Sequence, residues 1–257
     1  MWQALRDELN HSSNDTFELI TVGLDALGND GCQPFMEAAK PTHPALIDRH
    51  HVLAEKFGVT NIPSAIWIDE NGVIVRPPEA APAPPAQADA RAKDTQADNP
   101  PDLSAAPERL RQMMEEAAKI PSNPEAYHQA LRDWVSKGAD SKFALSPDEV
   151  IERSQPRSAD IARGHAHFEI ATALEVAGKH EAAIAHFKKA HELVPDSWTF
   201  RRQAWSLESA GPMAGSPLAR FWQGPAPDAP EQWPYEGGWL EDIKREGAEN
   251  YNEPFRP

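Results

Sequence analysis

The stretch that decides the fold is residues 57–76, which read Phe-Gly-Val-Thr-Asn-Ile-Pro-Ser-Ala-Ile-Trp-Ile-Asp-Glu-Asn-Gly-Val-Ile-Val-Arg. Gly58 is suited to end a helix, because glycine readily adopts the left-handed backbone conformation of a helix C-cap. After Pro63, two apolar runs, Ser64–Asp69 and Val73–Arg76, flank an Asn-Gly pair. That pair between two such runs is a strong local signal for a β-hairpin. The stretch therefore predicts a helix end, a proline loop and two antiparallel strands.

The residues before this stretch alternate between helical and strand patterns. A helical stripe of Trp2, Leu5 and Leu9 predicts a helix over residues 1–10. The apolar run Phe17–Asp25 suits a strand that is covered on both faces. The remaining predicted elements are a short helix over Cys32–Ala39 capped by Asn29-Asp30-Gly31, a short strand within His43–Asp48, and a helix from Val52 to Phe57.

The second part of the chain is separated by a change in composition. Residues 77–102 alternate proline with alanine and small polar residues, which predicts an extended, semi-stiff linker. An ordered, wrapped segment is the alternative. Residues 103–210 are helical in pattern, with an apolar stripe around Trp134 and a helix start at Ser146-Pro147. Residues 211–257 are rich in tryptophan, proline and glycine and are predicted to be irregular.

Composition restricts the function classes. The chain of 257 residues is long enough for two modest domains, and it carries 40 acidic and 25 basic residues, a net charge of −15. Such a surface repels nucleic acid and anionic membranes, so neither is expected as a partner. The sequence shows no apolar run long enough to span a bilayer and no signal peptide at its charged start, so a cytoplasmic location is expected.

Residues 164–197 resemble one tetratricopeptide repeat of 34 residues. In such a repeat, small residues let two antiparallel helices approach closely, a glycine turns the chain between them and a proline closes the second helix. The matching positions are Ala171, Gly178, Ala183, Phe187, Ala190 and Pro195. A single repeat cannot bury its own apolar face and needs neighbours, such as a degenerate partner around Trp134. The hairpin could bind a peptide or protein, or it could simply complete a core.

Residues 1–76 resemble thioredoxin-like proteins, in particular the thiol–disulfide reductases of the TlpA/ResA type. The resemblance is carried by the order of predicted elements and by the Gly58-to-Pro63 loop that precedes the hairpin. It implies that the Ile62-Pro63 bond is cis, and that Ile62, Pro63 and Ser64 flank the place where thiols and peptides dock. The first strand of that fold and its Cys-x-x-Cys turn are absent from these residues. A late start, a fragment, or another strand that fills the gap could each explain this.

The other candidate sites are weaker. Cys32 is the only cysteine, and at the start of a predicted helix its thiolate could be favoured. Asp30 opposes that, and no second cysteine is present to resolve an oxidised thiol, so a packing role is expected. No histidine pair has the i, i+4 spacing of a helical zinc site, and no glycine-rich phosphate loop occurs. No metal and no cofactor are therefore expected.

Together these patterns predict an incomplete thioredoxin-like α/β domain over residues 1–76, a linker, and an all-α domain that contains a tetratricopeptide-type hairpin. Two functions compete. The first is a redox-inactive adaptor that binds a protein or peptide. This function matches what the residues of this chain can do, and it favours a protein that is not an enzyme. The alternative is a thiol–disulfide oxidoreductase of the redoxin family whose catalytic turn is missing from this chain.

Overall fold

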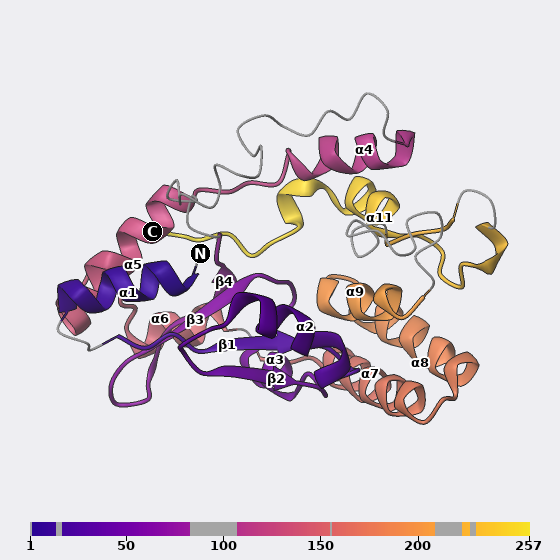
Figure 1. Ribbon diagram of the computed structural model, residues 1–257, viewed down its shortest axis with the longest axis horizontal. Helices are drawn as coiled ribbons and strands as arrows, with labels where there is room; N and C mark the ends of the chain where they lie inside the picture. Colours follow the sequence, from indigo (N-terminus) through magenta and orange to yellow (C-terminus); the bar gives the residue numbers. More distant parts are fainter. Residues whose placement is uncertain (1, 14–16, 83–106, 155, 209–222, 227–229) are drawn as a thin grey trace.

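The computed structural model describes residues 2–13, 17–82, 107–154, 156–208, 223–226 and 230–257. Helices dominate the described chain, together with two small sheets (Figure 1). In chain order the elements are α1 (Trp2–Ser13), β1 (Thr21–Leu24), α2 (Asn29–Ala39), β2 (Ala45–Asp48), α3 (Val52–Phe57), β3 (Ser64–Ile68), β4 (Ile74–Ala80), α4 (Glu108–Ala117), α5 (Pro124–Lys137), η1 (Gly138–Asp140), α6 (Pro147–Arg153), α7 (Ala159–Val176), α8 (His180–Leu193), α9 (Trp198–Ser206), η3 (Pro230–Gln232), α11 (Trp239–Glu246) and η4 (Ala248–Asn250). The predicted mixture of α/β and helical regions is confirmed in these general terms.

The helix ends follow from local sequence. Gly58 caps α3 at a φ of 77°, in the left-handed region that glycine adopts without a steric cost. Ser146 and Glu149 form a capping box at the start of α6, in which each side chain bonds the other residue's main chain. The side chain of Asn123 accepts a hydrogen bond from the amide of Ala126 and so caps α5. These short-range signals place the ends of three helices.

The strands form two separate pairs instead of one continuous sheet. β1 and β2 are parallel, with Val22 opposite Leu46, while β3 and β4 are antiparallel, with Ser64 opposite Ala80. Within the described residues, β1 and β3 each have a single hydrogen-bonded neighbour. β1 is also shorter than the predicted strand over Phe17–Asp25. The sequence predicted the strands and the hairpin, but their assembly into a single sheet is not observed.

One apolar core joins the first residues of the chain to α5. It contains Leu5 and Leu9 of α1, Trp67 of β3, and Tyr127 and Leu131 of α5, all buried. The prediction that the helix around Trp134 packs as a partner of the helical repeat is therefore wrong. The ring of Trp134 stacks on the ring of Trp67 in β3, with centroids 5.0 Å apart. The predicted linker does not separate two independent cores, because α5 packs on the α/β region.

A second core lies within the helical hairpin and the elements that cover it. The antiparallel helices α7 and α8 pack with α9 and α11 (Figure 1). Its largest buried side chains are aromatic, and Phe168 and Phe200 stack with ring centroids 4.3 Å apart. Aromatic pairs of this kind contribute packing beyond the area that they bury.

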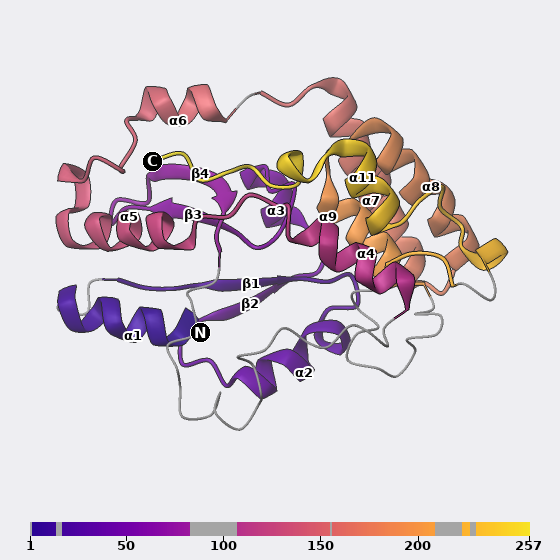
Figure 2. The ribbon, with the colours of Figure 1, turned by 90° about the horizontal axis from the view of Figure 1, so that it is seen from above.

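The α/β region meets the helical region through buried polar contacts. Gln203 of α9 accepts hydrogen bonds from the amide of Ala26 at 2.9 Å and from the His51 imidazole at 3.2 Å. The ring of His51 also packs 4.7 Å from that of Phe168. Figure 2 shows α3 beside the α7–α9 group, on the side of the sheets away from α1. Because Gln203 is buried, these bonds fix how the two regions sit against each other.

Two predicted irregular segments are partly ordered. β4 continues through Pro77 and Pro78 to Ala80, so the predicted linker begins with four residues of strand. A strand with one paired edge tolerates proline, which has no amide hydrogen to donate. The predicted irregular tail, residues 211–257, contains α11, whose apolar face enters the second core. The rest of the predicted linker, residues 83–102, and tail residues 211–222 and 227–229 lie outside the described residues.

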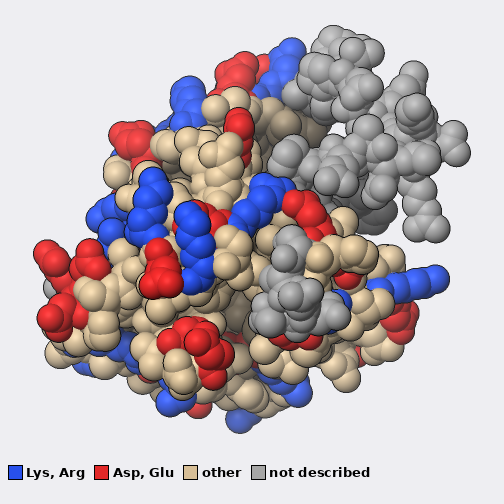
Figure 3. All heavy atoms as spheres, turned by 90° about the vertical axis from the view of Figure 1, so that its left-hand side faces the viewer, with Lys and Arg blue, Asp and Glu red and all other residues tan. Residues whose placement is uncertain are grey.

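Among the described helices, none combines the length and apolar composition that crossing a bilayer requires. The face at the left of Figure 1 carries acidic and basic side chains side by side, interspersed with uncharged residues (Figure 3). On this face no single sign of charge dominates.

Candidate functional site

The predicted proline loop connects α3 to β3, and its Ile62–Pro63 peptide bond is cis. The loop is held by Asn61, whose side chain is buried. Its amide nitrogen donates to the carbonyl of Tyr251 at 2.7 Å and to Asn252 Oδ1 at 2.9 Å, and its oxygen accepts from the amide of Ile62 at 2.9 Å. A buried amide with this many partners fixes the loop firmly.

The two ends of the loop are tied to different parts of the molecule. The carbonyl of Thr60 accepts a hydrogen bond from the amide of Thr199 in α9 at 2.9 Å. On the other side, the carbonyl of Pro63 accepts from Ala81 at 3.1 Å, and the hydroxyl of Ser64 donates to the carbonyl of Glu79 at 3.0 Å. The loop therefore links β4 to the start of α9, and Pro63 and Ile62 remain exposed.

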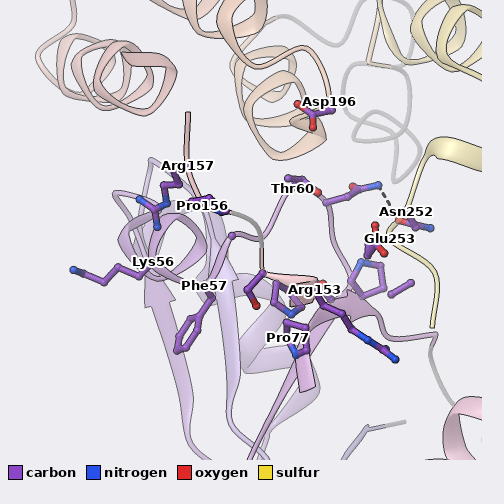
Figure 4. Close-up of a pocket in the computed structure, with 17 residues that line it drawn as sticks. Lys56, Phe57, Thr60, Pro77, Arg153, Pro156, Arg157, Asp196, Asn252 and Glu253 are labelled. Carbon is purple, nitrogen blue, oxygen red and sulfur yellow. Dashed lines mark hydrogen bonds between the residues drawn. The ribbon is translucent and has the colours of Figure 1, made fainter. Parts of the chain in front are cut away.

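A pocket with a cavity volume of about 460 Å³ lies against this loop. Its described wall comes from five separate segments: the end of α3 with the loop, β4, the chain around α6, Asp196 between α8 and α9, and the 252–253 region (Figure 4). The lining residues include Pro63 and Ser64 of the predicted site. The size lies in the usual range of ligand pockets, roughly 300–1,000 Å³.

Charged groups of both signs surround the pocket. Lys56, Arg153 and Arg157 contribute positive charge, and Asp196 and Glu253 contribute negative charge on other walls (Figure 4). The Arg157 guanidinium pairs with Glu55 Oε1 at 2.7 Å and also bonds the main-chain carbonyl of that residue. Lys56 makes no ion pair with a described residue. A ligand that carries both charges would find partners here.

Prolines make up much of the apolar wall. Pro63, Pro77, Pro78 and Pro156 line the pocket, with Phe57 at its edge. Proline rings have fixed backbone angles and no rotatable side chain, so this wall loses little conformational entropy when a ligand binds. This part of the pocket wall is therefore stiff.

A buried ion pair fixes the strand that forms one wall. Arg76 in β4 is 1% exposed and donates to both carboxylate oxygens of Glu79, at 2.5 and 3.0 Å. Its guanidinium also bonds the carbonyls of Phe143 at 3.0 Å and Arg256 at 2.5 Å. No sequence pattern indicated this pair. Arginine three residues before glutamate is common on surfaces, and nothing local showed that both would be buried.

Cys32 lies elsewhere, in the first turns of α2. It is not among the described residues that line the pocket. Burial, with the nearby carboxylate of Asp25, raises the pKa of its thiol. A β-carbon placed on Gly23 would lie 2.8 Å from its sulfur, so the thiol packs tightly against β1. A raised pKa disfavours the thiolate, which is the nucleophilic form.

The repeat positions form packing contacts. Ala171, Ala183, Phe187 and Ala190 are buried between α7 and α8. Gly178 adopts a φ of 71° in the turn between the helices, and the exposed Pro195 follows α8. Since the three alanines and Phe187 face the core, they provide no ligand contacts of their own, and none of the repeat positions lines the pocket at the Pro63 loop.

Four of the ten histidines bear on a possible metal or titrating site. His167 of α7 and His186 of α8 meet with their Nδ1 atoms 2.9 Å apart, a contact between helices that their spacing in the sequence did not reveal. Burial lowers the pKa of His51 and of His191 to about 4. Across the described residues, no group of three or more histidine, cysteine or acidic side chains could hold a metal ion.

The pocket residues could not be grouped from sequence, except for the Pro63 loop. Lys56 and Arg157 are about 100 positions apart, and Glu253 is almost another 100 further on. No motif links them, because they belong to segments that only the tertiary packing brings together.

No family model, no curated protein and no solved structure matches this chain.

Proposed function

We propose that this chain is a protein-interaction module that binds an extended peptide segment in the pocket at the Pro63 loop. The observation that carries the proposal is the pocket itself. It is a cavity with proline walls and charges of both signs around it. Peptide sites commonly combine pockets for side chains with main-chain partners, and β4, which has one strand neighbour among the described residues, forms part of this wall.

The charge distribution favours a peptide over a simple anion or cation. Lys56 and Arg153 suit an acidic side chain or a carboxylate, while Asp196 suits a basic one. A ligand of a single charge would meet repulsion on the opposite wall. A peptide can place acidic and basic residues along its length, which turns both signs into specificity.

The thioredoxin-like and tetratricopeptide-like assignments fit this proposal. A parallel strand pair, a helix, the proline loop and an antiparallel hairpin follow one another in the order that the thioredoxin resemblance implies. The α7–α8 hairpin with its small buried residues fits the repeat resemblance for residues 164–197. We propose both as the origin of the two regions, with residues 1–76 lacking the first strand of the fold.

Redox catalysis has no supporting contact at this site. The chain has one cysteine, its pKa is raised, and it does not line the pocket. Thiol–disulfide exchange needs a thiolate at the place where the substrate docks. The oxidoreductase alternative therefore requires a thiol that these residues do not provide, and turnover in an insulin-reduction assay would reinstate it.

The proposal is tested with peptides selected on the whole chain from a displayed library. The best peptide is then titrated by fluorescence anisotropy against wild type and two pocket variants, Thr60→Trp, which fills the cavity, and Lys56→Glu, which reverses a charge. Thr60 and Lys56 have exposed side chains, so neither change disturbs a core. We expect the Kd to rise at least tenfold in each variant.

Matched controls make the same substitutions away from the pocket. Thr42→Trp and Lys188→Glu change exposed residues on other segments and should leave the Kd within a factor of two. Peptides that bind all five proteins equally would overturn the proposed site.

A further inference from the structure

Residues 252–256 lie along β4, beside the Pro63 loop. Both ribbon views show this yellow segment next to β4 (Figures 1 and 2). The carbonyl of Glu253 accepts a hydrogen bond from the amide of Ala80 at 2.8 Å. Asn252 accepts from the side chain of Asn61, and the carbonyl of Arg256 accepts from the buried guanidinium of Arg76. Of these contacts, the bond between Ala80 and Glu253 joins two main chains, as the bonds of an added strand do.

A single aromatic side chain anchors the segment. Phe255 packs edge-on to Tyr127, with ring centroids 5.4 Å apart, and lies near Phe143. The Arg76 guanidinium carbon stands 4.7 Å from the centre of the Phe255 ring, a cation–π contact in a buried setting. Phe255 therefore fills a slot whose polar end is provided by Arg76.

The remaining side chains of the segment contribute little burial. Glu253, Pro254 and Arg256 are exposed, and Asn252 and Phe255 are only half-buried. Asn252 and Glu253 also form one wall of the pocket. The pocket and the strip of β4 under the segment are therefore continuous, and a few contacts hold the segment over that strip.

We propose that residues 252–256 are a tethered occupant of the peptide site. When they leave, the site extends from the pocket along β4 and accepts an extended segment of the same chemistry. That partner carries an aromatic residue two positions after the residue whose carbonyl meets the Ala80 amide. This inference rests on the proposed function, because it identifies the ligand class of the same site.

Because residues 252–256 belong to the same chain as the site, such a partner should bind the whole chain weakly. A segment joined by a short connection competes at an effective concentration in the millimolar range. The apparent Kd of a free peptide is then its intrinsic Kd divided by the fraction of time for which the site is free. Weakening the tethered segment should therefore strengthen binding in trans.

The test uses a fluorescein-labelled peptide, Asn-Glu-Pro-Phe-Arg-Pro, titrated against the full chain. Phe255→Ala removes the anchor of the tethered segment and should lower the Kd of the probe at least tenfold relative to wild type. Phe255→Leu keeps an apolar group in the slot, so it guards against a variant that fails to fold, and it should give an intermediate Kd. Phe35→Ala, an exposed phenylalanine in α2, should match wild type. A probe with alanine in place of its phenylalanine should bind none of these proteins.

Equal Kd values for wild type and both Phe255 variants, or binding to none of them, would overturn this inference. A dimer that is lost in Phe255→Ala, seen by light scattering, would also overturn it, because the segment would then exchange between two copies. The proposed function is refuted separately if library-selected peptides bind Thr60→Trp as tightly as wild type. If the selected peptides lose affinity for Thr60→Trp but the labelled probe does not bind, the proposed pocket is still supported and only the tethered occupant is refuted.

Discussion

The helical region and the strand region of this protein differ in how completely they bury their apolar side chains. In the α7–α8 hairpin, Ala171 and Ala183 are fully buried and the aromatic side chains beneath them stack. On the β1–β2 pair, Val22 is 38% exposed and Leu46, opposite it, is 47% exposed. A helix satisfies its main-chain hydrogen bonds within itself, whereas a strand needs a neighbour on each side. The helices therefore need only side-chain packing, while β1 and β3 each have one partner among the described strands.

The buried alanines test the helical side of this comparison, and here the largest effect is expected. Ala183→Asp places a charge in a site with no exposed surface, so it should cost more than about 4 kcal/mol and unfold the hairpin. Ala182→Asp, one residue earlier on the exposed face of α8, is the matched control and should change stability by less than about 0.5 kcal/mol. Urea denaturation measures both. Equal unfolding midpoints would refute the repeat-like packing.

The Arg76–Glu79 pair tests the strand side. Arg76→Met leaves the Glu79 carboxylate buried without its partner, which should cost about 3–5 kcal/mol. The double variant Arg76→Met/Glu79→Leu should recover most of that loss, because no unpaired charge remains. Arg132→Met breaks the exposed pair with Glu8 and should cost about 0–1 kcal/mol. A loss as small for Arg76→Met as for the surface control would show that β4 is not held by this pair.

The buried histidines give a pH test of both regions. The pKa of His51 at the α/β side and of His191 in α8 is lowered to about 4, below the unfolded value of about 6.5. Between these values the unfolded chain binds more protons, so stability falls as pH drops from 6.5 toward 4. At pH 5 each histidine should cost roughly 2 kcal/mol of the stability present at pH 7.

Removal of one histidine isolates its share of that loss. His51→Gln and His191→Gln should each flatten the stability profile between pH 7 and pH 5 by about that amount, roughly 2 kcal/mol, measured by urea denaturation at each pH. His50→Gln, an exposed neighbour, serves as the control. An unchanged profile in His51→Gln would mean that the junction with Gln203 opens to solvent.

The smallest effect is expected at the cysteine. Because burial raises the pKa of Cys32, we expect slow reaction with a disulfide reagent at pH 7 and no measurable insulin reduction by the chain. Cys32→Ser should leave peptide binding and any disulfide activity unchanged. A clear loss of activity in this variant would show that Cys32 contributes to the function.

Local signals in the sequence were enough for most of the elements. Gly58, the Ser146-Pro147 start and the Gly178 turn fixed helix ends, because each acts through its own backbone conformation or a bond to a residue three or four positions away. The hairpin after Pro63 was predicted for the same reason. The pairing of strands and the packing of α5 on Trp67 were not, because they depend on contacts between distant segments.

In the candidate site, too, residues from one short stretch could be predicted, whereas residues from distant segments could not. Ile62, Pro63 and Ser64 were predicted from one short stretch, and the structure places Pro63 and Ser64 on the pocket wall. Lys56, Arg157 and the 252–253 wall come from segments that no spacing rule connects. The buried state of Arg76 could not be inferred either, because it depends on Phe255 and Tyr127 covering β4.

Amide hydrogen exchange of the whole chain, with and without the selected peptide, locates the binding site along the sequence. We expect slower exchange at Asn61, Ser64 and Ala80 when the peptide is bound, with no change in α7 and α8. Protection confined to the α7–α8 hairpin, with the loop amides exchanging as before, would contradict this expectation and move the binding site to the helical region.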